Sequence, residues 1–418
     1  MVGKVLAMRL WNPLKVRAFR WLWSGSAFSA LADAAFFVAL AWLVLRVSGP
    51  GVGIGAVLAV GSIPGAILLP LGGVLSDRFS PLWILTTANV VRCALVGSLA
   101  ALLFANRLEI WHLYVLAGTL SIVDALYYPA SMSMIPRLVS EGRLEGANAL
   151  AQGVDQICGI VGPLLAGVLV FLFGLGSTFG TIAVLFLAAG VTFVGMMRLS
   201  GVVTGKLCAA GSDDSTRERH PGTLDDLRAG LRYGLNDPLI RSMLVILVGV
   251  NCALMGPLYV GGVMLAEREL GGGGAFGILV SVACAGALLG GVVAGSFEWR
   301  RRGPLILVST GVVGVGVGLV AFVDNLAVAS AVGFLFCSAS SFAAVLIISL
   351  IQGRSDPAFV GRTMSLVMFA ATALDPVSFI LAGVLAELGL TVLFLSAGGL
   401  VLLTAFAGAA SATVRAYE

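Results

Sequence analysis

Apolar stretches long enough to cross a membrane alternate with short polar connections along almost the whole chain. A helix rises about 1.5 Å per residue, so about 20 apolar residues cross the hydrocarbon core with every backbone polar group paired internally. The helices that these stretches predict run over residues 19–45, 52–75, 82–104, 110–134, 146–173, 178–198, 239–266, 275–298, 304–323, 326–351, 362–386 and 390–413. The pattern therefore predicts an all-α membrane protein with twelve transmembrane helices.

One long polar segment separates the first six predicted spans from the last six. We predict an N-terminal six-helix bundle over residues 1–198, a cytoplasmic linker over 199–238 and a C-terminal six-helix bundle over 239–418. Near the end of the linker, leucines with helical spacing predict an amphipathic helix: Leu224, Leu227, Leu231 and Leu235. Two placements of this helix stay open, one on the inner membrane surface and one packed against the bundles.

Composition and charge agree with a membrane protein and give its orientation. Only 11% of the residues are charged, whereas about a quarter are charged in a soluble domain, and the mean hydropathy is +1.04. A cytoplasmic N-terminus leaves only Arg46, Arg107 and Arg268 outside and Arg92 within a span, out of 25 Lys and Arg. We therefore predict a multi-pass protein of the cell inner membrane with both termini in the cytoplasm. The net charge of +4 reflects this topology, and no nucleic-acid partner is expected.

A weak internal repeat relates the two predicted bundles. A shift of 216 residues superposes Ala166-Gly167-Val168-Leu169 on Ala382-Gly383-Val384-Leu385. Six-helix repeats related by an axis along the membrane normal are typical of transporters whose two halves move around a site near the midplane. The repeat predicts two pseudo-symmetric bundles and alternating access.

After the second span, Gly72-Gly73-Val74-Leu75-Ser76-Asp77-Arg78-Phe79 resembles the loop signature of the major facilitator superfamily. Ser80 and Pro81 replace the last Gly-Arg of that signature, and the second half lacks its acid in register. The resemblance covers essentially the whole length and implies the fold of that superfamily. It also implies that the loop around Gly73, Asp77 and Arg78 controls gating, with Asp77 locking the cytoplasmic ends of the two halves. A carboxylate there can accept hydrogen bonds from helix-end N–H groups near Arg362 in span eleven, and a solvated loop charge is the alternative.

A second motif favours export. In span five, the segment around Gly162 and Pro163 resembles the antiporter motif of exporters in the same superfamily, with departures at the first glycine and at Ala166. Small residues allow close helix packing and proline bends a helix, so ordinary packing is the alternative explanation. Further short segments resemble the subgroup that exports drugs, macrolides and siderophores: Phe19-Arg20-Trp21-Leu22-Trp23, Tyr128-Pro129-Ala130, Ala147-Asn148-Ala149-Leu150 and Gly361-Arg362-Thr363-Met364-Ser365.

Five ionisable residues fall inside predicted spans: Asp33, Arg92, Asp124, Asp155 and Asp375. An ionised group at the helix centre costs about 2.5–3.5 kcal/mol by insertion scales, so such residues face a cavity, a partner or both. Counting from the cytoplasmic ends places Arg92 and Asp124 at one depth and Asp33 deeper. We therefore predict that Arg92 pairs with Asp124 and that Asp33 and Asp124 are proton-sensitive. A purely structural ion pair is the alternative.

The remaining polar and aromatic positions within the spans predict the walls of a substrate cavity. We expect it to be lined by Ser29, Phe36, Tyr128, Gln152 and Asp155 in the first half and by Asn251, Met255, Tyr259, Ser338 and Asp375 in the second. Methionine and aromatic faces suit bulky amphipathic ligands. For Asp375, attraction of a cationic substrate and a second proton site both stay open.

Other chemistry has little support in the sequence. The six cysteines are scattered, and we expect no disulfide, metal site or cofactor. Gly271-Gly272-Gly273-Gly274 lacks the Lys-Ser/Thr element of a phosphate loop, and no nucleophile constellation indicates an enzyme. The first span lacks a small-residue cleavage site and is expected to stay in the membrane.

The sequence thus predicts a proton-coupled antiporter that exports amphipathic drug-like or siderophore-like molecules by alternating access. Its expected partners are a small-molecule substrate, protons and the lipid bilayer, and the resemblance implies a monomer. Two alternatives stay open. One is a gradient-driven importer of a small metabolite, and the other is a non-transporting membrane protein that handles lipid or acts as a sensor.

Overall fold

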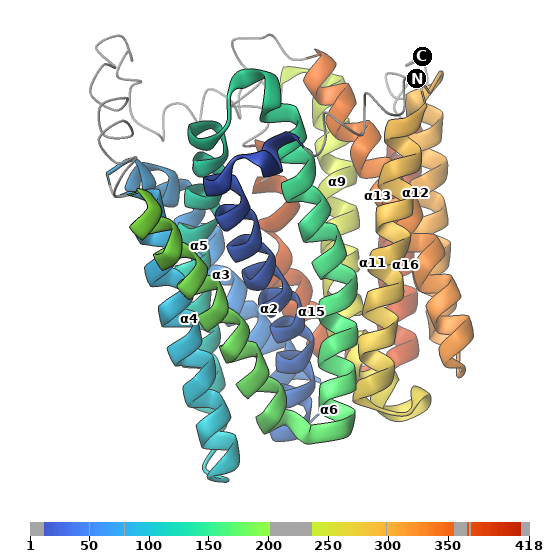
Figure 1. Ribbon diagram of the computed structural model, residues 1–418. Coiled ribbons are helices and arrows are strands. Elements are labelled where there is room, and N and C mark those ends of the chain that lie inside the picture. The colour runs from blue at the N-terminus through green and yellow to red at the C-terminus, as the bar shows by residue number, and fades with distance from the viewer. Residues whose placement is uncertain are drawn as a thin grey trace. The chain divides into compact units, whose positions relative to one another are not determined.

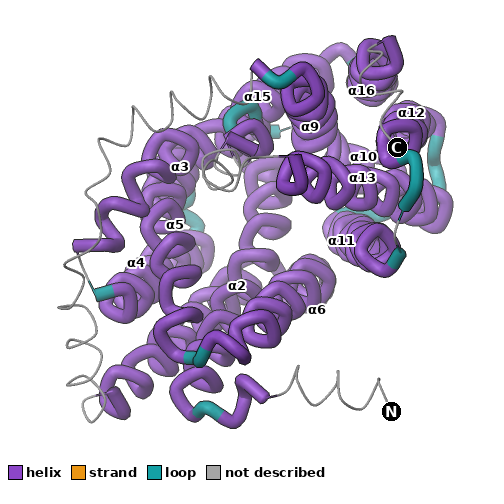
Figure 2. Tube along the Cα trace, turned by 90° about the horizontal axis from the view of Figure 1, so that it is seen from above, coloured by secondary structure: helices purple, strands orange, loops and turns teal. Residues whose placement is uncertain are grey.

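The computed structural model describes residues 12–49, 51–78, 80–200, 236–297, 299–354, 366–367 and 369–410. Within these ranges the chain forms helices and connecting loops, with no strand (Figure 2). This confirms the predicted all-α class. Arg362 and most of the predicted linker, including its amphipathic helix, lie outside the described residues.

The first half of the chain contains a short 3₁₀ helix and five α-helical elements. They are η1 (Asn12–Lys15), α2 (Arg17–Ser48), α3 (Val52–Arg78), α4 (Pro81–Phe104), α5 (Ile110–Leu138) and α6 (Glu141–Ser200). Helix α6 contains two predicted spans, because the backbone leaves the helical region at Gly174 (φ 77°, ψ 174°). The green ribbon of α6 reverses direction near its label (Figure 1).

The second half contains the remaining predicted spans. Its elements are α9 (Pro238–Gly256), η2 (Pro257–Gly261), α10 (Gly262–Leu265), η3 (Ala266–Leu270), α11 (Gly273–Ser296), α12 (Arg302–Leu319), η4 (Val320–Phe322), α13 (Leu326–Arg354), α15 (Asp375–Leu388) and α16 (Leu390–Ala410). The elements from α9 to η3 form one continuous span over Pro238–Leu270.

Ten described helices are long and apolar enough to cross a membrane, and Val52–Leu68 is a shorter apolar helix. Since one of the ten reverses at Gly174, every predicted span has a helical counterpart. The boundaries differ from the prediction by a few residues. One difference affects the expected gating loop, because α3 continues to Arg78 and places Gly73, Asp77 and Arg78 on helical backbone.

The chain divides into two compact units. The described residues of 1–39 and 63–219 form unit 1, and those of 40–62 and 220–418 form unit 2. The predicted N-terminal bundle assigned all of residues 1–198 to the first half, whereas residues 40–62 pack within unit 2. Glycine explains this packing, because a Cβ on Gly383 of α15 would lie 3.1 Å from the Cα of Val52 and 3.4 Å from that of Gly55. The two backbones can approach this closely only without a side chain.

The core of unit 1 joins its helices through large apolar side chains. One buried cluster includes Phe19 from α2, Leu85 from α4, Met134 from α5 and Phe193 from α6. Trp23 adds a polar link, since its Nε1 donates to the carbonyl oxygen of Leu150 at 3.2 Å. This packing fixes the relative positions of the helices that carry the ionisable residues.

The span from α9 to η3 departs from regular α-helix in two places. Both Pro257–Gly261 and Ala266–Leu270 are π-helical. Proline has no backbone N–H, so Pro257 cannot donate the bond that a regular helix requires at that position. The span ends at Gly271, whose left-handed conformation (φ 97°) suits glycine.

The start of α9 is fixed by Asp237. Its carboxylate accepts from the backbone N–H groups of Leu239 at 2.8 Å and Ile240 at 3.3 Å, and from Nε of Arg354 at 2.8 Å. Burial raises the pKa of Asp237, but the hydrogen bond from Arg354 and those from the two backbone N–H groups outweigh burial and lower its pKa below the usual value. The carboxylate therefore caps α9 and links it to the end of α13.

We predict that Asp237→Ala lowers the free energy of unfolding by about 1 kcal/mol, because the helix loses its N-cap. Asp237→Asn keeps the cap and removes only the charge, so it serves as the matched control. A lowered folded-state pKa means that the advantage of Asp over Asn is present above the unfolded pKa of about 3.9 and fades as the pH falls through the folded value. Thermal unfolding of the three proteins at neutral and acidic pH measures both effects, and equal stability of Asp237→Ala and wild type would exclude the capping role.

Candidate functional site

Among the described residues of unit 1, the most buried charge is the guanidinium of Arg92 on α4. Its side chain is 2% exposed and reaches two other helices. Nη1 donates to Oγ of Ser29 at 2.9 Å and to Oδ2 of Asp33 at 3.3 Å, both on α2. Nη2 donates to Oδ1 of Asp124 on α5. One cation is therefore shared by two carboxylates and a hydroxyl.

Aromatic rings complete the surroundings of Arg92. The guanidinium carbon lies 4.2 Å from the ring centroid of Tyr127 and 5.5 Å from that of Phe186. A cation over an aromatic face is stabilised by the ring quadrupole, more strongly where water is excluded. Tyr127 from α5 and Phe186 from α6 thus hold the cation in place where the carboxylates do not cover it.

The two carboxylates differ from the arginine in their exposure. The side chain of Asp33 is 41% exposed and that of Asp124 is 52% exposed. The cation is thus held inside unit 1, while its two counter-ions retain access to the surroundings.

The expected contact between Arg92 and Asp124 is present, and the structure adds Asp33 to it. Depth counting had placed Asp33 about one turn away from the pair, but the extended side chain of an arginine bridges that distance. Ser29 was expected to line a cavity, whereas it is completely buried and accepts from Arg92. Sequence reasoning missed Tyr127, because its neighbour Tyr128 shares the polar face of α5 that had indicated the site.

The other positions expected along a cavity in unit 1 lie on α2, α5 and α6. Tyr128, Gln152 and Asp155 are exposed, and Asp155 is close enough to Asp33 and Tyr128 to interact electrostatically. Phe36 is half-buried and packs edge-on against Phe179, with 6.0 Å between ring centroids. Asp155 is therefore a third acid in the neighbourhood of the shared cation.

Gly162 and Pro163 are buried in the part of α6 that precedes Gly174. A Cβ on Gly162 would lie 2.6 Å from the Cβ of Ala34 on α2, so the glycine allows these helices to approach closely. Four residues before Gly162, Sγ of Cys158 donates to the carbonyl oxygen of Ala27 at 3.5 Å. The motif in span five thus lies against the helix that carries Asp33.

Unit 2 contains a pocket of about 260 Å³ between α9–η2, α11, α12 and α13. Three of the expected cavity residues, Asn251, Met255 and Tyr259, line it. Its other polar lining residues are Cys284, Thr310, Cys337, Ser340 and Ser341. Most of the other lining side chains are aliphatic. An apolar wall with a few polar groups is typical of small-molecule sites.

Two expected residues of unit 2 lie apart from this pocket's lining. Ser338 packs with its backbone against α11, where a Cβ on Gly290 would overlap the Ser338 carbonyl group. Asp375 begins α15 directly after the turn at Ala373 and Leu374. Among the described residues its buried Oδ1 has no hydrogen-bond partner. Asp375 interacts electrostatically with Cys252 and Tyr259, so it lies near the pocket without lining it.

Comparison with protein families gives one match over most of the chain. Residues 22–374 match the model of the Major Facilitator Superfamily. Curated relatives include macrolide efflux protein A of Streptococcus pyogenes, 23% identical over 94% of this chain and 96% of that protein. They also include the multidrug efflux pump Tap of Mycolicibacterium fortuitum, 25% identical over 84% of each chain.

Solved structures show the same fold. The nucleoside transporter NupG superposes with a TM-score of 0.74 over 94% of this chain and 99% of that chain, at 14% identity. A transporter of the POT family superposes with a TM-score of 0.72 over 94% and 95%, at 12% identity. At this identity the likeness concerns the fold alone.

We predict that Arg92→Met destabilises the protein by about 3 kcal/mol, because it leaves Asp33 and Asp124 close together without their cation. Adding Asp33→Asn and Asp124→Asn to this variant should restore much of the loss, since no unpaired charge then remains. Arg107→Met, in an exposed connection, is the control. Thermal unfolding of the purified variants measures the effect. A single Arg92→Met variant as stable as wild type would show that the shared cation does not stabilise unit 1.

Proposed function

The chain belongs to the Major Facilitator Superfamily, and on that basis we propose that it is a proton-coupled antiporter that exports amphipathic small molecules by alternating access. It works as a monomer in the cell inner membrane, with both termini in the cytoplasm. The observation that carries this proposal is the buried cation of Arg92 shared by two partly exposed carboxylates, Asp33 and Asp124.

Sharing one cation between two acids provides a means of coupling. When a proton neutralises one carboxylate, Arg92 keeps the other as its counter-ion, so the buried charge is never left unpaired. The hydrogen bonds to the protonated acid weaken, and the helix that carries it is held less tightly to α4. Since Asp33 lies on α2 and Asp124 on α5, proton binding changes how strongly each of these helices is held to Arg92, while Ser29 keeps one contact with α2.

Export of the substrate is supported by two kinds of observation. Macrolide efflux protein A and the multidrug efflux pump Tap are efflux proteins by name, and both are similar to this chain over most of its length. Gly162, whose segment with Pro163 resembles the antiporter motif of exporters, lies against α2. A shift of α2 on protonation of Asp33 therefore acts directly on this close helix contact.

The pocket of unit 2 supports an amphipathic substrate. Aliphatic side chains and Met255 provide a deformable apolar wall, while Asn251, Tyr259 and Ser341 provide a few polar contacts. Asp375 is a further acid within a span and serves either a cationic group of the substrate or a proton. Gating by Asp77, Arg78 and Arg362 remains part of the proposal.

Transport in inverted membrane vesicles tests the function and its direction. With an imposed proton gradient, we predict gradient-driven accumulation of at least one amphipathic compound from a panel of macrolides, dyes and siderophores, and its loss with a protonophore. Asp33→Asn and Asp124→Asn should each reduce the gradient-driven rate at least tenfold. Asp324→Asn, in an exposed connection, should leave it unchanged.

Full gradient-driven transport by both Asp33→Asn and Asp124→Asn would refute the coupling assignment. Gradient-driven uptake in right-side-out vesicles, without transport in inverted ones, would identify an importer. No solute flux in either orientation would favour the non-transporting alternative.

A further inference from the structure

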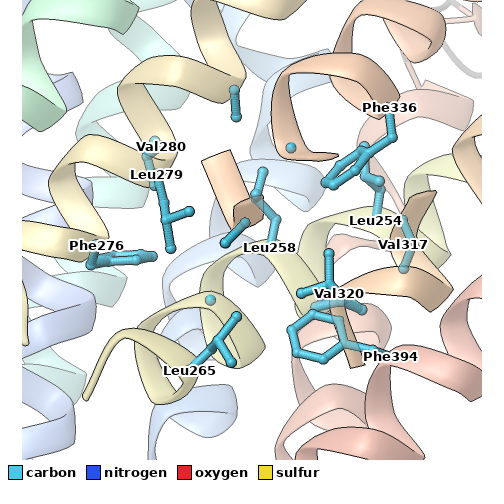
Figure 3. Close-up of a pocket in the computed structure, with 15 residues that line it drawn as sticks. Leu254, Leu258, Leu265, Phe276, Leu279, Val280, Val317, Val320, Phe336 and Phe394 are labelled. Carbon is cyan, nitrogen blue, oxygen red and sulfur yellow. The ribbon is translucent and has the colours of Figure 1, made fainter. Parts of the chain in front are cut away.

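A second pocket lies inside unit 2 and is entirely apolar (Figure 3). Its volume is about 50 Å³, and all fifteen lining residues are apolar. They come from the span α9–η2–α10 and from α11, α12, η4, α13 and α16. Figure 3 shows Phe276, Phe336 and Phe394 around the space, with Leu254 and Leu258 between them. A cavity of this composition excludes water and accepts an apolar group.

The apolar pocket adjoins the pocket with polar lining. Leu254, Leu258, Val280 and Ala283 line both. A molecule bound in the larger pocket therefore contacts the side chains that form the wall of the smaller one. The two spaces differ in chemistry, because only the larger is lined by polar residues such as Asn251, Tyr259 and Ser341.

One residue of the wall between the pockets, Leu258, lies on irregular backbone. Leu258 lines both spaces and Tyr259 lines the larger one, and both belong to the π-helical segment Pro257–Gly261. Single π-helical turns within α-helices occur frequently at functional sites. Here the segment places two consecutive side chains at the pockets: Leu258 lines both of them, and Tyr259 lines the larger one.

Gly333 on α13 keeps the small pocket open. It is buried and lines the pocket, yet a Cβ built on it meets no atom within 4 Å. Other buried glycines of unit 2 serve close packing: a Cβ on Gly314 would lie 2.8 Å from Leu402, and one on Gly398 would lie 2.8 Å from the backbone of Gly318. Glycine inside a helix is less favourable than alanine. Packing does not explain Gly333, whereas an unfilled pocket does.

We propose that this pocket receives a short apolar substituent of the transported molecule, while the polar part of the molecule lies against Asn251, Tyr259 and Ser341. This inference rests on the proposed function and narrows its substrate class. A cavity of about 150 Å³ holds benzene, so about 50 Å³ suits two or three carbon atoms. The ligand is thus an amphipathic molecule with a ring-sized body and an ethyl- or isopropyl-sized extension.

The probes are phenol and the 4-alkylphenols from methyl to butyl, and binding to the full-length protein in lipid nanodiscs is measured without a proton gradient. For wild type, Kd should fall about fourfold for each added carbon up to ethyl or propyl and then level off. Gly333→Val adds three carbon atoms to the pocket. It should bind phenol like wild type and 4-ethylphenol about tenfold more weakly.

Gly353→Val is the matched control, because Gly353 lies on the same helix, is exposed and also has no atom near its missing Cβ. The Kd values measured with this control include any effect of a valine on α13 outside the pocket and any partitioning of the phenols into the lipid. Thermal unfolding of Gly333→Val at or above the wild-type temperature shows that the variant is folded. If Kd fell by the same factor per added carbon in wild type and in Gly333→Val, the proposal would be overturned.

Xenon provides a second readout that needs no polar contact. Xenon should occupy the pocket in wild type and be excluded from it in Gly333→Val, as seen by crystallography under xenon pressure or by xenon NMR. Absence of xenon from the wild-type pocket would overturn the proposal, whatever the phenols do. Since neither measurement uses a gradient, loss of proton-driven export would refute the proposed function and leave these results standing.

Discussion

The burial of the Arg92 guanidinium is the constraint on which the packing around it and the proposed coupling depend. Arg92 cannot lose its charge, so it must be solvated by the protein. Asp33, Asp124 and Ser29 provide hydrogen-bond acceptors, and Tyr127 and Phe186 provide aromatic faces. Three helices are thereby tied to one charge. Under the proposed function, the protonation state of each acid sets how strongly its helix is held to Arg92.

The second unit has different chemistry. Its described pockets are lined mainly by aliphatic and aromatic residues, with polar groups on one of them only. The span that contributes to both pockets is π-helical at Pro257–Gly261 and Ala266–Leu270. Under the proposed function, coupling and substrate shape therefore use separate residues. The variants proposed above test the two properties separately.

Much of the fold was predictable from the sequence, because the lipid imposes a minimum length on each apolar helix. The contact between Arg92 and Asp124 followed from their equal depth. The participation of Asp33 did not, because depth counting ignores the reach of an arginine side chain. The role of Tyr127 was not predicted, because it depends on the rotation of α5 about its axis. The π-helical segments were not predicted either, because they depend on local hydrogen bonding, as around Pro257. The sequence predicted a loop at Asp77 and Arg78, because the motif there resembles a loop signature, whereas their backbone is helical.

Infrared difference spectroscopy tests the shared cation most directly, because a protonated carboxyl group has its own C=O stretching band. Lowering the pH of purified protein should produce such a band, and a transported substrate should reduce it. The band should be weakened in Asp33→Asn and in Asp124→Asn, and weakened most when both substitutions are combined. A band of full intensity in the double variant would show that other acids carry the proton and would contradict this account.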